Sequence, residues 1–154
     1  MNWLVSLLLG LHLAVAQVQT AAAQPVEVVN GGGGGTLDGA SAFSQFGFGV
    51  TVDGAAARGH FECLMAGASA VPGLQLMAVQ GEVHSAIVAK DSATFEGVAT
   101  VNMGNQGSLP GQPFRATVTA GGAEAGTLQL TLLGPDVVMT LPTEAVLRGL
   151  ITVH

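Results

Sequence analysis

The chain has 154 residues, of which 49% are hydrophobic, 9% are charged and 23 are glycine. This length fits a single domain, and so apolar a chain can bury a core, which argues against a charge-rich disordered protein. Four basic residues stand against 10 acidic ones, for a formal net charge of −6. So few cations argue against a nucleic-acid partner and against binding to an anionic membrane surface.

The N-terminus has the features of a signal peptide. Residues 4–15 form an apolar run that is too short to span a bilayer comfortably, and A-x-A spacing ends at Ala16 and again at Ala23. No Lys or Arg precedes the run. We expect a signal peptide over 1–23, cleaved after Ala16 or Ala23, with no membrane span in the mature chain. The protein is then secreted, periplasmic or held at the cell surface; the alternative is an uncleaved N-terminal anchor.

Five consecutive glycines follow at 31–35. A phosphate-binding P-loop ends in Gly-Lys-Ser or Gly-Lys-Thr, whereas this run continues with Thr-Leu-Asp. A dinucleotide-binding turn leads into a helix, and no helical pattern follows here. The glycines therefore predict a flexible linker over 24–42, ahead of a domain over 43–154.

From Phe43 on, short alternating runs are separated by Gly, Pro, Asp and Asn. Helical spacing is nearly absent, and 143–148 is the one stretch suited to a single helical turn. The runs predict an all-β domain, either an antiparallel β-sandwich or a small β-barrel of about eight strands. In chain order the runs are 43–53, 58–65, 74–88, 93–102, 114–120, 126–134, 137–142 and 146–154.

The order of these runs resembles a known family. FGFGV, ATFEGVATVN, FRATVTAGG…GTLQLTL and a closing Gly-Leu-Ile-Thr-Val strand are similar to exported bacterial β-domains that often follow choice-of-anchor modules in larger surface proteins. The similarity covers about 43–154, and it implies a compact β-domain in an extracellular setting with no activity to carry over. The family's acidic, glycine-rich turn before the penultimate hairpin is reduced here to GGAEAG, with Glu124 as its one acid, so no ion site is carried over.

The segment ARGHFECLMAG, residues 57–67, concentrates the chemically versatile side chains. On a strand, Arg58, His60 and Glu62 share one face, while Cys63 lies on the other with its aromatic and methionine neighbours. The histidine and the carboxylate therefore point away from the thiol, which excludes a Cys–His pair within this strand. Cys63 is the chain's sole cysteine, and we predict that it is a core residue rather than a nucleophile.

The following strand repeats the polar pattern with Glu82 and His84. If the two strands pair, His60 lies opposite Glu82; a shift of two residues sets His60 against His84 and Glu62 against Glu82. Two histidines and two carboxylates suit Zn²⁺ or Cu²⁺, which makes these four residues the candidate metal ligands. The alternatives are a solvated face with cross-strand ion pairs worth about 0–1 kcal/mol each, or a kink at Gly81 that separates the two sets.

No catalytic set of residues emerges from the sequence, since a G-x-S-x-G elbow is absent and Tyr is missing altogether. The first hypothesis is an exported non-enzymatic β-domain with a structural, adhesive or protein-binding role, a cell-surface or extracellular protein as partner and no cofactor. The second is a barrel around an apolar ligand, and the third is a metal-binding protein using the His/Glu face. The oligomeric state stays open. The residues expected to line the apolar cavity are Phe46, Phe48, Phe61, Met65, Met77, Phe95 and Phe114.

Overall fold

The computed structural model describes residues 25–37, 42–67, 76–121 and 125–154. The expected signal peptide over 1–23 and both of its cleavage positions lie outside these residues. Across the described ranges, no helix is long and apolar enough to cross a membrane. The strands are β1 (Glu27–Thr36), β2 (Ala42–Asp53), β3 (Ala56–Gly67), β4 (Leu76–Ala89), β5 (Ser92–Asn102), β6 (Ser108–Thr119), β7 (Thr127–Leu133), β8 (Val138–Thr140) and β9 (Glu144–Val153), with one 3-10 turn, η1 (Gly104–Gln106).

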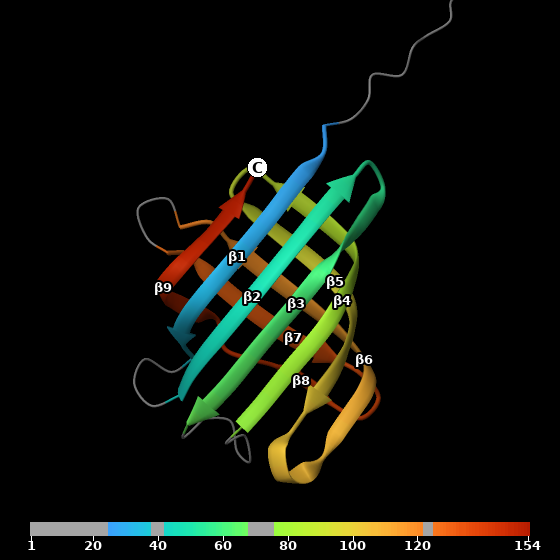
Figure 1. Ribbon diagram of the computed structural model, residues 1–154, viewed down its shortest axis with the longest axis vertical. Helices are drawn as coiled ribbons and strands as arrows, with labels where there is room; N and C mark the ends of the chain where they lie inside the picture. Colours follow the sequence, from blue (N-terminus) through green and yellow to red (C-terminus); the bar gives the residue numbers. More distant parts are fainter. Residues whose placement is uncertain (1–24, 38–41, 68–75, 122–124) are drawn as a thin grey trace, which may run out of the picture.

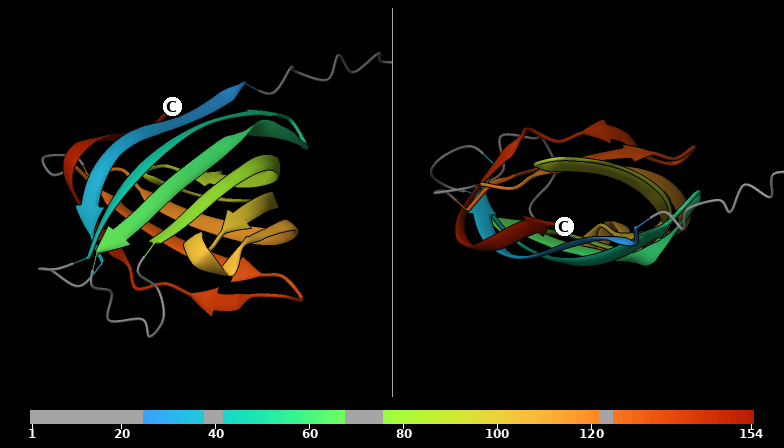
Figure 2. Two further views of the ribbon diagram at one scale, coloured as in Figure 1. Left: turned by 60° about the horizontal axis from the view of Figure 1, so that its bottom comes forward. Right: turned by 90° about the horizontal axis from the view of Figure 1, so that it is seen from above.

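The strands form one antiparallel sheet that closes on itself. Their order is β6-β5-β4-β3-β2-β1-β9-β7-β8, and an additional β6–β7 pairing completes a ring of eight strands with β8 attached to β7. Strands β9, β1, β2, β3 and β4 form the front layer in Figure 1, while β5, β6 and β7 cross behind them. Seen from above, the ring is flattened (Figure 2). The predicted fold class, an all-β antiparallel sandwich or small barrel of about eight strands, is confirmed.

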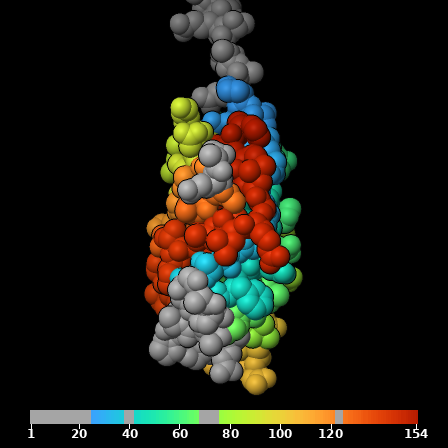
Figure 3. Space-filling view, turned by 90° about the vertical axis from the view of Figure 1, so that its left-hand side faces the viewer, coloured from blue at the N-terminus to red at the C-terminus, as the bar shows by residue number. Residues whose placement is uncertain are grey.

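Strand β1 overturns the prediction of a flexible linker over 24–42 for residues 27–36, whereas 24 and 38–41 lie outside the described residues. The glycines at 31–35 pair with β2 on one side and with β9 on the other. A strand bonded along both edges satisfies its backbone groups whatever its side chains are, and this pairing outweighs the weak strand preference of glycine. Likewise, 143–148 makes no helical turn, because Glu144 begins β9. Figure 3 shows β9 beside β1, at the side where the ring closes toward β7.

The glycines of β1 have two different roles, set by the face on which they lie. A Cβ added at Gly31 would overlap the Phe48 ring, and one added at Gly33 would overlap the carbonyl oxygen of Arg148. Both positions point into the ring, where β9 and the core approach the β1 backbone closely. Gly32 points outward, and its added Cβ would make an ordinary 3.7 Å contact with the Phe46 carbonyl oxygen. Close packing therefore requires glycine on the inner face but not at Gly32.

The interior of the ring is filled by packed side chains. The rings of Phe48 and Phe95 have centroids 5.3 Å apart, and Phe61 lies 5.9 Å from Phe95 and 5.4 Å from Phe114. Cys63 is buried in the same cluster, so the prediction of a core cysteine is confirmed. All seven residues expected to line an apolar cavity belong to this buried cluster. They pack against one another as core.

Candidate functional site

The predicted metal ligands lie on the outer face of β3 and β4. His60 is opposite Glu82 and Glu62 is opposite Gln80, so the first of the two predicted registers is the one formed. The register between β4 and β5 shifts between Val83 and Ser85, which places the irregularity at His84 and not at Gly81. The β3–β4 pairing ends at Gly59–Val83, so His84 has no partner position on β3.

The candidate metal set is consequently split. Within the described ranges, no three His, Cys, Asp or Glu side chains lie close enough together to share a metal ion. His60 and Glu82 also form no ion pair there; the pair found among the described residues joins Arg115 and Glu96 at 2.6 Å. The face carries exposed polar side chains in a row rather than a converging set of ligands.

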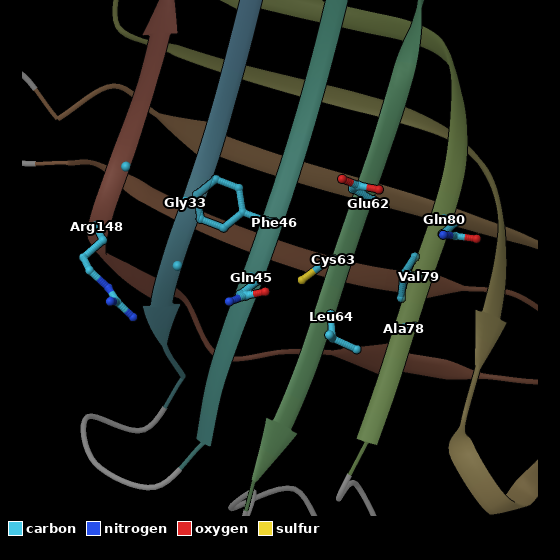
Figure 4. Close-up of a pocket in the computed structure, with 12 residues that line it drawn as sticks. Gly33, Gln45, Phe46, Glu62, Cys63, Leu64, Ala78, Val79, Gln80 and Arg148 are labelled. Carbon is cyan, nitrogen blue, oxygen red and sulfur yellow. The ribbon is translucent and has the colours of Figure 1, made fainter.

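A hollow of about 660 Å³ opens on this outer face, across β9, β1, β2, β3 and β4, and its lining also includes the core residues Phe46, Cys63 and Val79. Figure 4 shows its side chains projecting from β9 on one flank and from β2, β3 and β4 on the other. We call this hollow the outer groove and define it by six of its lining residues. They are Gly34, Gln45, Leu64, Ala78, Gln80 and Arg148.

The outer groove follows from the register of the strands. Gly34 pairs with both Arg148 and Gln45, Gln45 pairs with Leu64, and Leu64 pairs with Ala78. These five residues form one row across five strands, in which neighbouring Cβ positions are about 5 Å apart. Gly34 supplies no side chain between Arg148 and Gln45, and Ala78 supplies only a methyl group at the β4 end, so the surface is low on both sides of the Gln45 and Leu64 side chains.

A second hollow of about 320 Å³ adjoins the outer groove. Glu62 and Gln80 line both hollows, and the second one adds His60, Glu82 and Thr100. Three of the four predicted metal ligands therefore lie along one extended concave surface, although they do not converge on a point. His84 is not part of its lining.

An apolar patch borders the outer groove. Phe43, Leu64 and Leu76 are 51%, 39% and 48% exposed. Phe43 pairs with Ala66, which pairs with Leu76, and Leu64 lies two residues before Ala66 on the same face of β3. These three large side chains on three adjacent strands form an exposed cluster, a feature typical of interaction surfaces.

The inner face holds a second polar feature, which sequence reasoning missed. Ser44 and Glu144 are 1% and 2% exposed, and the Ser44 hydroxyl donates a hydrogen bond to Oε1 of Glu144. Burial raises the pKa of the Glu144 carboxyl, and the Ser44 hydrogen bond opposes that rise. The local signal was available for Ser44, because it alternates in phase with Phe46 and so points inward. No local signal connects it with Glu144, 100 residues away.

Cys63 lies close enough to this pair to respond to it. Burial raises the pKa of the Cys63 thiol from 9.0 to about 12; the negative charge of Glu144 adds to the rise, and a hydrogen bond between Cys63 and Ser44 opposes it. A thiol with such a pKa is protonated at neutral pH, whereas nucleophilic chemistry requires the thiolate. The three inward polar side chains therefore form a buried hydrogen-bonding cluster with the properties of a structural element.

Sequence analysis also missed the outer groove, because no local pattern connects the residues that line it. Gln45, Ala78 and Arg148 belong to no recognisable motif. Gly34 lines the groove because it lies in strand β1, whereas the sequence analysis predicted a flexible linker there. The alternation of glycine with other residues at 47 and 49 was a usable signal, because both positions lie on the face opposite the buried Phe46 and Phe48.

Comparisons of the chain with protein-family models, with curated proteins and with solved structures find no match. The likeness to exported β-domains drawn from strand patterns therefore stays a prediction.

Proposed function

We propose that this chain is an exported, non-enzymatic β-barrel domain that binds another protein through the outer face of β1–β4. The observation that carries the proposal is the outer groove, an open hollow with both polar and apolar walls beside an exposed apolar patch. Protein interfaces combine apolar anchors at their centre with a polar rim, and this surface offers both.

The rigidity of the surface supports the proposal. Each of the strands β1, β2, β3 and β4 is paired along both edges, and the inner faces of β2, β3 and β4 are held by the aromatic core. A surface held in this way loses little conformational entropy when a partner binds, so more of the contact energy appears as affinity.

The buried polar cluster also supports a non-enzymatic role. Cys63 carries a thiol whose pKa is raised to about 12, and Glu144 is buried with its carboxyl bonded to Ser44. Groups that perform acid–base or nucleophilic work have pKa values near the working pH and reach a substrate. A cluster that is sealed inside the ring fits a role in joining strands.

The proposal that the chain is exported rests on its sequence. The apolar run over 4–15 and the A-x-A spacing before Ala23 support export, and the likeness to surface-protein β-domains points the same way. The partner is then a cell-surface or extracellular protein.

The test uses a variant that fills the outer groove without touching the core. Ala78 points outward from β4 and lines the groove, so Ala78→Trp places a large ring in the hollow. The matched control is Thr119→Trp, an outward position on β6 in the back layer of the ring. A partner is isolated from the compartment to which the chain is exported, purified, and titrated with each variant by calorimetry.

We expect Ala78→Trp to weaken binding by at least about tenfold, as a blocked central contact does, and Thr119→Trp to leave the affinity unchanged. Equal thermal melts of the three proteins establish that the fold is intact. Equal affinity of the wild type and Ala78→Trp contradicts the proposal. Native mass spectrometry that finds a small apolar molecule retained by the chain, with no protein partner, favours the ligand-binding barrel instead.

A further inference from the structure

Two carboxylates, those of Glu62 and Glu82, give one end of the concave surface a negative charge. Glu62 on β3 and Glu82 on β4 are both exposed, and Glu82 lies two residues beyond Gln80, the residue opposite Glu62. Such diagonal neighbours are about 7 Å apart, close enough for one cation to interact with both carboxylates. Neither forms an ion pair within the described ranges, so both charges face solvent.

The charge of the whole chain has the same sign. The formal net charge is −6, with four basic residues in the entire sequence. A basic group approaching this face is attracted both by the chain as a whole and by the two local carboxylates. An acidic group is repelled by the net charge of the chain at long range and by the two carboxylates at short range.

The distance between the acidic and apolar parts of the face is set by the strand. Leu64 and Glu62 are successive outward residues of β3, and successive residues on one face of a strand are about 7 Å apart. The midpoint between Glu62 and Glu82 is therefore one to two such steps from Leu64. An extended segment lying along β3 has the same repeat, so its side chains at positions i and i+2 or i+4 match these two parts.

Two glycines on the outward face of β2 flank the acidic part. Gly47 is opposite Glu62 and Gly49 is opposite His60. A Cβ added at Gly47 would lie 3.1 Å from Oε1 of Glu62, and one added at Gly49 would lie 3.5 Å from Cε1 of His60, so these two side chains extend over the glycines. A bound segment therefore lies along β3 above them, and the exposed Glu62 carboxyl turns toward β4 to share a cation with Glu82.

Resting on the proposed function, we propose that the partner presents an extended segment with an apolar residue and, two to four positions away, a Lys or Arg. The apolar side chain packs on Leu64 and its neighbours Phe43 and Leu76. The cationic group lies between Glu62 and Glu82, with Gln80 beside it.

The test uses the full mature chain, labelled with nitrogen-15, and three capped synthetic peptides in a Gly/Thr host. One peptide carries Leu and Arg two positions apart, one carries Leu and Glu, and one carries Ser and Arg. We expect the Leu–Arg peptide to shift backbone amide signals of β3 and β4 and to bind more tightly than the other two. Added salt should weaken its binding, because exposed charge pairs are screened.

Two double variants separate a local charge effect from a general one. Glu62→Gln/Glu82→Gln removes the two proposed contacts, and Asp53→Asn/Asp91→Asn removes the same net charge at exposed positions elsewhere. We expect the first to weaken Leu–Arg binding by about 5- to 10-fold and the second to leave it nearly unchanged.

The outcomes distinguish this inference from the proposed function. Equal binding of the Arg and Glu peptides in the outer groove overturns the basic-segment inference and leaves groove binding standing. An equal loss in both double variants, or an equal response to free spermidine, shows a general attraction of cations and also overturns it. Absence of any shift on β3 and β4 overturns it as well, whereas the proposed function is judged separately by Ala78→Trp against the natural partner.

Discussion

Ser44 on β2 and Glu144 on β9 are hydrogen-bonded inside the ring, across the intervening strand β1. Gly35 of β1 pairs with Ser44, and an added Cβ there would crowd the Glu144 side chain. Glu144 also belongs to the β7–β9 seam, where just two residue pairs are formed, Thr127–Ala145 and Leu128–Glu144. A buried carboxyl group therefore lies where two neighbouring strands of the ring share the fewest residue pairs.

The first prediction concerns pH. The folded-state pKa of Glu144 is raised above its ordinary value of 4.5 by burial, so its contribution to stability is fully present below pH 4.5 and is lost as the pH rises through the folded-state pKa. Thermal melts from pH 4 upward should therefore show a decline in the wild type that is smaller in Glu144→Gln. Parallel pH profiles of the two proteins would show that folding does not raise the pKa of this carboxyl.

The second prediction separates the two faces of β1. Gly33→Ala places a methyl group against the carbonyl oxygen of Arg148 and should cost about 1–3 kcal/mol of unfolding free energy, as overpacking does. Gly32→Ala meets an ordinary contact at 3.7 Å and should be neutral or stabilise by about 0.4–1 kcal/mol, because it restricts the unfolded chain. Urea unfolding of both variants gives the comparison. Equal midpoints would mean that β1 does not pack against β9 as described.

The third prediction concerns the aromatic core. Phe61 is 1% exposed and packs against Phe95 and Phe114, so Phe61→Ala should destabilise the fold by about 3–5 kcal/mol. Phe43 is 51% exposed, and Phe43→Ala should cost far less while weakening partner binding. Denaturant unfolding and partner titration of both variants check this. A large loss of stability in Phe43→Ala would show that this ring belongs to the core and not to the binding face.

The fourth prediction concerns the thiol. Cys63 is buried and its pKa is raised to about 12, so a thiol reagent at pH 8 should modify the native chain very slowly and the urea-unfolded chain quickly. The native rate should follow the rate of opening of the ring, since the reagent needs both access and the thiolate. Rapid modification of the folded protein would instead mark Cys63 as accessible and reactive.

The fifth prediction concerns processing. If 1–23 is a signal peptide, the exported protein begins at Gln24 or, with the earlier cleavage, at Gln17. Both sites precede β1, which starts at Glu27, so the ring keeps all of its strands in either case. Intact-mass measurement of the protein recovered from the export compartment decides between them. A mass that includes residues 1–16 would indicate the uncleaved anchor.

Local periodicity was enough to predict the all-β class and the faces of β2 and β3. Alternation at Phe46, Phe48 and Val50 and at Phe61 and Cys63 placed the right side chains inside, because the side-chain period of a strand is a property of neighbouring residues. The same reasoning put His60 opposite Glu82 as one of two registers. Alternation along one strand is the same in both registers, so it could not choose between them. The irregularity at His84 arises where β4 pairs with β5, which no local pattern reveals.

The rest was decided by the tertiary structure. A run of five glycines has no side-chain pattern to read, and it is a strand because β2 and β9, the second more than a hundred residues away, bond to its two edges. The outer groove and the Ser44–Glu144 pair exist for the same reason, since each joins residues from strands that are distant in the chain. Composition and alternation determine the all-β class and the direction in which the alternating strands face, whereas ring closure makes the glycine run a strand and determines which faces meet.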